Sequence, residues 1–223
     1  MESDKLVMGI NLKAYSSAMG VRAVKIARAA EEMSKAYGCE IFVCVMPTDL
    51  RMVKASASSI KIFAQHMDPV EDGAFTGHIT PLALKDAGAD GVMLNHSERR
   101  LRLDQIDECV NLAVKHNLKT LVCANTPLEA KAVACFDVDM VAVEPPELIG
   151  GRVSVSTARP EVVRNTVRMV REVNRYAKIL VGAGIKNALD VKKSLALGAD
   201  GVLLASAVAK AQDPRKAIEN LIV

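Results

Sequence analysis

The stretch Gly88-Ala89-Asp90-Gly91-Val92-Met93-Leu94-Asn95-His96 contains the signals that decide the fold of this chain. A glycine typical of a helix end is followed by a short turn, an apolar run and two polar residues. The first five residues recur as Gly198-Ala199-Asp200-Gly201-Val202. This recurrence indicates that one kind of helix-to-strand connection is used at least twice.

Seven other apolar runs are similar to residues 91–94 in length and composition. They are rich in β-branched residues and do not alternate with polar ones, which is typical of strands buried on both faces. The predicted strands span residues 6–10, 40–45, 60–64, 91–94, 120–123, 140–143, 179–181 and 202–204.

Amphipathic segments that favour helices separate these runs, and their starts are well marked. Thr80-Pro81, Thr126-Pro127 and Asp213-Pro214 each supply a capping oxygen followed by a proline at the first helical position. Ser16 or Ser17 is expected to cap the first long helix in the same way.

Strands that alternate with helices form either a closed barrel or a doubly wound open sheet. Polar or small residues follow several predicted strands, at the ends where barrels carry their chemistry. An open sheet would favour a glycine-rich turn after the first strand, and this sequence has none there. We therefore predict an α/β protein with a single domain, a closed (β/α)8 barrel over residues 1–223. The residues that follow the strands are Asn11, Lys13, Asn95, His96, Glu144, Gly182, Gly184 and Ser206.

Composition excludes several classes of function. The net charge of the 223 residues is only +3 and the basic residues form no long run, so we expect no nucleic-acid partner. The sequence has no apolar stretch of about 20 residues, so we expect no contact with a membrane. Five cysteines without metal-site spacing predict buried, reduced thiols in a cytoplasmic protein. His96 has no ligand spacing with the other histidines, so we expect no metal.

Two side chains at predicted strand ends suit chemistry on an anion. Lys13 can neutralise a phosphate or a developing oxyanion, although an exposed lysine is the alternative. A histidine at a strand end is as often structural as catalytic, but His96 precedes the charged cluster Ser97-Glu98-Arg99-Arg100. Because buried charges need partners, Glu98 is expected to pair with Lys13 or an arginine and to hold the site rigid.

Glu144 follows the apolar run 140–143, and a carboxylate at the mouth of a barrel would be partly desolvated, as suits a general base. An exposed glutamate is the alternative. The stretch Pro145-Pro146-Glu147-Leu148-Ile149-Gly150-Gly151 combines a stiff entry, a short apolar tip and a glycine pair, as a hinged lid does. The small residues Gly182-Ala183-Gly184 and Ala205-Ser206 allow backbone N–H groups to approach a phosphate.

Taken together, these residues resemble the triosephosphate isomerase family over essentially the whole chain. The shortness of the chain is similar to the compact archaeal branch of that family. The matching motifs are Asn11-Leu12-Lys13, Gln65, Gly73-Ala74-Phe75-Thr76-Gly77, Asn95-His96-Ser97-Glu98-Arg99-Arg100, Glu144-Pro145, Ile149-Gly150 and Gly182-Ala183-Gly184.

The resemblance implies a TIM barrel that interconverts dihydroxyacetone phosphate and glyceraldehyde 3-phosphate in glycolysis and gluconeogenesis. It implies that Glu144 moves the proton, His96 polarises the carbonyl, Lys13 stabilises the enediolate and Asn11 helps to position the substrate. No cofactor is needed, because only a proton moves. The resemblance also implies a homodimer or homotetramer assembled through the 73–77 loop. Further substrate contacts would come from Leu12, Ile149, Gly150, Gly184, Ala205 and Ser206, with Glu98 in support.

Two other hypotheses stay open at this point. Another phosphate-binding barrel enzyme, such as a sugar-phosphate epimerase or an indole-glycerol-phosphate-type lyase, would suit the small residues after the last two strands equally well. Epimerases, however, tend to need metal ligands or an aspartate pair, which the strand ends lack. A barrel retained only for binding is disfavoured, because Lys13, His96 and Glu144 are all present.

Overall fold

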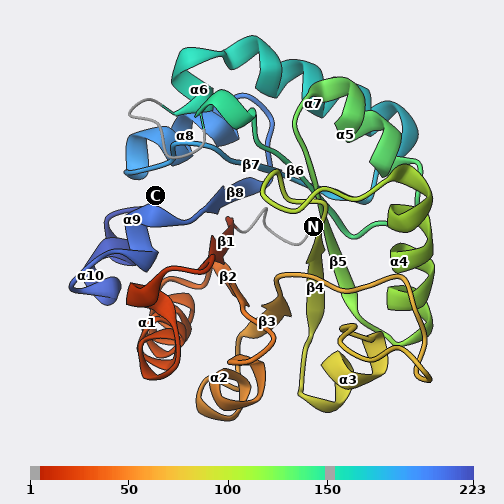
Figure 1. Ribbon diagram of the computed structural model, residues 1–223. Helices are drawn as coiled ribbons and strands as arrows, with labels where there is room; N and C mark the ends of the chain where they lie inside the picture. The colour runs from red at the N-terminus through yellow and green to blue at the C-terminus, as the bar shows by residue number, and fades with distance from the viewer. Residues whose placement is uncertain (1–5, 149–153) are drawn as a thin grey trace.

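The computed structural model describes residues 6–148 and 154–223, in which eight parallel strands close into one barrel with helices around the outside (Figure 1). Each strand pairs with the next along the chain, and β8 closes the barrel on β1, with Ile10 opposite Leu204. The predicted (β/α)8 barrel is confirmed, and every predicted strand forms within one residue of its expected ends. The strands are β1 (Val7–Asn11), β2 (Glu40–Val45), β3 (Lys61–Ala64), β4 (Gly91–Leu94), β5 (Lys119–Ala124), β6 (Met140–Val143), β7 (Lys178–Val181) and β8 (Gly201–Leu204).

Three helices begin where the capping residues predicted. Thr80, Thr126 and Asp213 each accept a hydrogen bond from the backbone N–H three residues further on. The α-helices are α1 (Val21–Tyr37), α2 (Leu50–Ser56), α3 (Pro81–Asp86), α4 (Leu103–Lys115), α5 (Pro127–Ala134), α6 (Val155–Ala158), α7 (Pro160–Val173), α8 (Ala188–Ala196), α9 (Ser206–Ala209) and α10 (Pro214–Glu219), with 3-10 turns η1 (Ser16–Ala18) and η2 (Pro146–Leu148).

The prediction for the start of the first long helix was wrong. Gly20, with φ of +57°, precedes α1, and no side chain caps that helix. Ser16 and Ser17 lie in η1, and the hydroxyl of Ser17 donates instead to the carbonyl of Ala209, 2.8 Å away. A tertiary partner therefore takes the hydroxyl that the sequence offered for capping.

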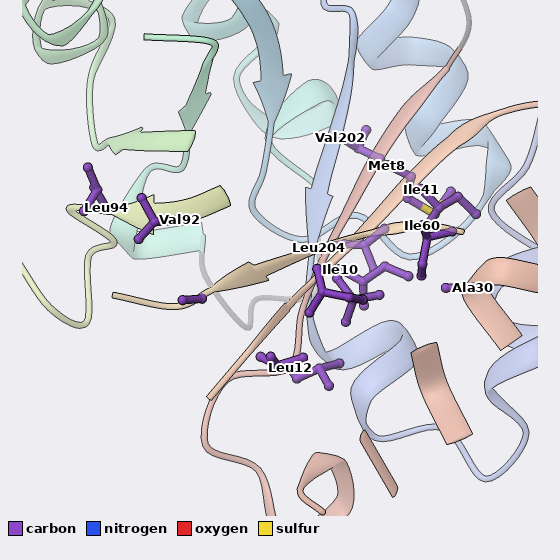
Figure 2. Packing of buried hydrophobic residues seen from close by; sticks show 14 of the residues in the cluster. Met8, Ile10, Leu12, Ala30, Ile41, Ile60, Val92, Leu94, Val202 and Leu204 are labelled. Atoms are coloured by element: carbon purple, nitrogen blue, oxygen red, sulfur yellow. The ribbon is translucent and has the colours of Figure 1, made fainter. Parts of the chain in front are cut away.

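Both faces of the barrel are buried, which explains why the strands do not alternate in polarity. Figure 2 shows side chains of the outer layer, including Met8, Ile10 and Val202, which pack with residues of the surrounding helices such as Ala30. The interior is filled by a second apolar cluster around the rings of Phe42 and Phe63, whose centroids lie 4.8 Å apart. The strands therefore carry apolar side chains both on the face toward the helices and on the face toward the barrel interior.

Two glycines end helices in the same way, as their sequence recurrence predicted. Gly88 has φ of +91° and Gly198 has φ of +95°, a left-handed conformation that favours glycine. Each precedes a turn into a buried strand, β4 or β8. None of the helices in the described part of the chain is long and apolar enough to cross a membrane.

Candidate active site

A cavity of about 200 Å³ lies at the carboxyl ends of the strands. It is lined by two of the four predicted catalytic residues, Lys13 and Glu144, together with the supporting residue Glu98, whereas His96 and Asn11 do not line it. The remaining lining comes from Tyr15, from the loop after β7 and from the end of β8. These last residues are Ala183, Gly184, Ile185, Lys186, Leu203, Leu204, Ala205 and Ser206.

Lys13 is held in an uncommon backbone conformation. Its φ is +50°, and the side-chain oxygen of Asn11 accepts a hydrogen bond from its backbone N–H at 2.9 Å. The amide of Gln65 donates to the Lys13 carbonyl and lies 3.2 Å from the same Asn11 oxygen. Asn11 and Gln65 thus stabilise a turn that most residues avoid, and this turn directs the Lys13 side chain toward the cavity.

The lysine side chain is 9% exposed, and its Nζ donates to the carboxylate of Glu98 at 2.6 Å. This ion pair joins the loops after β1 and β4, as the sequence predicted for Glu98. Because Glu98 is itself 56% exposed, the pair is partly solvated and can exchange when an anion enters the cavity.

His96 reaches the site because the backbone turns at Asn95, whose φ is +58°. The Asn95 side chain donates to the carbonyl of Cys123 and accepts from the backbone N–H of Leu101, both at 2.9 Å. The Nδ1 atom of His96 accepts from the backbone N–H of Glu98 at 3.2 Å. An imidazole that accepts at Nδ1 carries its proton on Nε2, so Nε2 is the atom free to donate.

Glu144 directly follows β6, and the residue as a whole is only 8% exposed. Its Oε2 atom lies 3.3 Å from Nε2 of His96. Both atoms are buried, and neither has a hydrogen-bond partner among the described residues. Buried polar atoms without partners are rare in native proteins, so this pair is a strong sign of a site that completes itself with a ligand.

Gly182 makes the room that the Glu144 side chain occupies. A Cβ atom at this position would lie 2.6 Å from Cγ of Glu144 and closer still to Oε1. Only glycine therefore leaves the carboxylate in its place. The position after β7 serves the glutamate after β6, which no local pattern in the sequence reveals.

Two thiols lie in the barrel interior below the carboxylate. Burial, and then the negative charge of Glu144, raises the pKa of the Cys44 thiol well above its ordinary value. The same two causes raise the pKa of Cys123. Both thiols therefore stay neutral. The cysteine prediction holds for four residues, whereas Cys135 is exposed because it ends α5 at the surface.

The loop after β7 and the start of α9 form the other end of the cavity. Gly184 has φ of +76°, and the described hydrogen bonds include no acceptor for the backbone N–H of Gly184, Ala205 or Ser206. Three free N–H donors beside Lys13 and Lys186 suit a ligand with several anionic oxygens.

Other predicted residues do not meet at this cavity. Leu12 is 1% exposed and packs in the layer between barrel and helices. Ile149 and Gly150 lie outside the described residues. Tyr15 and Lys186 also line the cavity and were not predicted, because their loop positions follow no periodic pattern. Among residues 6–148 and 154–223, no group of three His, Cys, Asp or Glu side chains is arranged to hold a metal ion.

Known proteins of one family resemble this chain over nearly its whole length. Residues 6–221 match the family described as triosephosphate isomerase. The chain is 46% identical to the triosephosphate isomerase of Methanocaldococcus jannaschii, over 97% of this chain and 99% of the relative. It is 44% identical to that of Methanopyrus kandleri, over 96% and 95% of the two chains. It is 47% identical to that of Caldivirga maquilingensis, again over 96% and 95%.

Proposed function

Because the chain belongs to the triosephosphate isomerase family, and is therefore an isomerase of triose phosphates, we propose that Glu144, His96 and Lys13 carry out its reaction. The observation that supports this assignment best is the buried pair of unpartnered atoms, Oε2 of Glu144 and Nε2 of His96. A substrate with an acidic C–H beside a carbonyl supplies what both atoms lack. The carboxylate accepts the proton, and the imidazole N–H donates to the carbonyl oxygen.

In this mechanism Glu144 removes a proton from the carbon next to the carbonyl of dihydroxyacetone phosphate. The electron pair of the C–H bond forms a C=C bond while the π pair of the carbonyl moves to its oxygen, which gives an enediolate. Nε2–H of His96 and the ammonium group of Lys13 stabilise the negative charge that develops. His96 donates its Nε2 proton to the former carbonyl oxygen and takes up the proton of the neighbouring hydroxyl, and Glu144 returns its proton to the former carbonyl carbon, which gives glyceraldehyde 3-phosphate. Atoms and electrons balance within the substrate, so the reaction consumes no co-reactant.

The phosphate group is assigned to the free backbone N–H groups of Gly184, Ala205 and Ser206. Backbone donors suit this group because they are fixed by the barrel and carry no charge that would have to be desolvated. Lys13 lines the same cavity as Glu144 and these N–H groups, so one cation is assigned to both the phosphate and the enediolate. Asn11 acts through Lys13, whose backbone it holds.

Replacement of Glu144 by Gln tests the assignment of the base. The variant keeps the shape of the side chain but does not accept the proton, so we expect kcat to fall by about 10³-fold or more. Competitive inhibition by inorganic phosphate should be nearly unchanged. Glu172→Gln serves as control, because it makes the same change in a glutamate of α7 that forms a surface ion pair with Lys131 of α5. This variant should behave like the wild type. A Glu144→Gln enzyme within tenfold of wild type, assayed after chelator treatment, would show that Glu144 is not the base.

The 73–77 loop supports assembly into a homodimer or homotetramer. All five of its residues are exposed, and Phe75 at 44% exposure contacts the imidazole of His78 edge-on, with 5.8 Å between the ring centroids. A partner surface that covers this ring would remove its apolar area from water, which favours association. The role of the family in glycolysis and the five free cysteines support a cytoplasmic location.

A further inference from the structure

Asp190, in the first turn of α8, uses both oxygens of its carboxylate on segments that lie apart in the sequence. Oδ2 accepts from the backbone N–H of Lys186 at 3.0 Å, and Oδ1 accepts from the hydroxyl of Ser154 at 2.6 Å. Lys186 belongs to the loop that lines the cavity after β7, whereas Ser154 immediately precedes α6. Figure 1 shows α6 beside α8, near the ends of β6 and β7.

The Ser154 end of this contact is buried and ordered by its neighbours. Ser154 is 2% exposed, although serine is usually exposed. Nζ of Lys193 donates to the hydroxyl oxygen of Thr157 at 3.0 Å, and that oxygen lies 3.2 Å from Oγ of Ser154. Because a carboxylate only accepts, the proton of Ser154 points to Asp190. A lysine, a threonine and a serine thus form one chain that ends on the aspartate.

A second bond ties the same two segments together. The backbone N–H of Val155 donates to the carbonyl of Ala183 at 3.1 Å. The loop 183–186 is therefore held at both ends, at Ala183 by the backbone and at Lys186 through Asp190. Between these points lies Gly184, with its left-handed backbone and its free N–H.

A helix cap alone does not account for this arrangement. Asn187 already caps α8 by accepting from the backbone N–H of Asp190 at 3.0 Å. The Asp190 carboxylate instead accepts from the backbone N–H of Lys186, which precedes that cap, through Oδ2, and from the hydroxyl of Ser154, outside the helix, through Oδ1. Two charge-assisted bonds from one rigid carboxylate fix the separation between loop and segment.

We infer that Asp190 is a positioning residue, which holds the loop 183–186 against the segment 154–157 and so keeps the N–H of Gly184 aimed at the phosphate of the substrate. This inference rests on the proposed phosphate site. Preorganised donors bind an anion more tightly than donors that must be ordered on binding. Loosening this anchor therefore weakens phosphate affinity, while the proton transfer between Glu144 and the substrate continues.

The test compares Asp190→Asn, Ser154→Ala and the double variant in KM, kcat and the inhibition constant of inorganic phosphate. Asp190→Asn retains one acceptor for two donors, so we expect KM and the phosphate inhibition constant to rise about tenfold, as the loss of one charge-assisted bond implies. We expect kcat to change by less than about threefold. Ser154→Ala should raise both constants about fivefold, and the double variant should be no worse than Asp190→Asn alone, because both changes remove the same bond.

Asp213→Asn is the matched control, because it makes the same change in a carboxylate that caps α10 away from the cavity. It should lower the melting temperature without moving either constant. The inference would be overturned if KM and the phosphate inhibition constant of Asp190→Asn stay within twofold of wild type, or rise only as much as in Asp213→Asn. If Asp190→Asn does not fold, the same criterion applies to Ser154→Ala. Ser206→Asp separates the two proposals: if it leaves phosphate inhibition unchanged, the phosphate site itself is wrong. If it abolishes inhibition while Asp190→Asn does not weaken it, only the positioning role fails.

Discussion

Replacement of Gly182 by alanine tests whether the position of the Glu144 carboxylate, and not only its presence, sets the rate. The φ of Gly182 lies outside the left-handed region, so φ alone does not oppose alanine at this position. The new Cβ atom would lie 2.6 Å from Cγ of Glu144, whereas ordinary contact begins at 3.4 Å, so the side chain has to move by about 0.8 Å. A displacement near 1 Å costs about 10²-fold when a reacting group must be aligned. We therefore expect kcat to fall by about 10²-fold.

The assay is steady-state kinetics in both directions, with inorganic phosphate as competitive inhibitor and thermal unfolding measured on the same samples. Phosphate inhibition should stay within about threefold of wild type, because the bonds that hold the loop 183–186 to Asp190 and Val155 remain. Gly9→Ala is the control, since its Cβ would also lie 2.6 Å from a side chain, but from the ring of Phe42 in the interior apolar layer. It should lower the melting temperature and keep most of kcat. A Gly182→Ala enzyme with kcat within threefold of wild type would refute the reasoning.

Two further predictions concern assembly and acid stability. Phe75→Asp should shift the protein to a smaller species in light scattering coupled to size-exclusion chromatography, because a charge at the tip of the exposed loop opposes burial of the loop in an interface. An unchanged mass would contradict assembly through this loop. Desolvation raises the pKa of Glu40, but hydrogen bonds from Lys178 and Lys61 outweigh it, so the pKa lies below the ordinary 4.5. The stability that Glu40 contributes is therefore present above pH 4.5 and is lost as the pH falls through the folded-state pKa. Glu40→Gln should therefore lower the unfolding free energy by about 1 kcal/mol at neutral pH, and urea titrations should show the gap to wild type closing in acid; a gap independent of pH would contradict this origin.

The sequence predicted well wherever the controlling interaction is local. Thr80, Thr126 and Asp213 cap the helices that they precede, because an N-cap bond spans only three residues. Gly88 and Gly198 end helices because a single positive φ is enough to do so. Ser17 shows the limit of such reasoning, since its hydroxyl found the carbonyl of Ala209, a residue far away in the chain.

The candidate site divides in the same manner. The order of polar residues after strand ends was enough to predict that Lys13, His96 and Glu144 share one end of a barrel, because parallel strands bring their carboxyl ends to the same face. It was also enough to predict an ion pair for Glu98, since a charge next to the site needs a partner. It was not enough for Leu12, whose side chain the structure turns into the layer beneath the helices.

By itself, therefore, the sequence determined the strands, three helix starts, the closed barrel and the identity of several residues at its mouth. All of these follow from periodicity, local hydrogen bonds and the parallel order of the strands. Only the tertiary structure decided that Gly182 makes room for Glu144, that Asp190 holds Ser154, and that Nε2 of His96 and Oε2 of Glu144 are left without partners. These features depend on distances between atoms from different strands and loops, and such distances exist only once β8 has closed on β1.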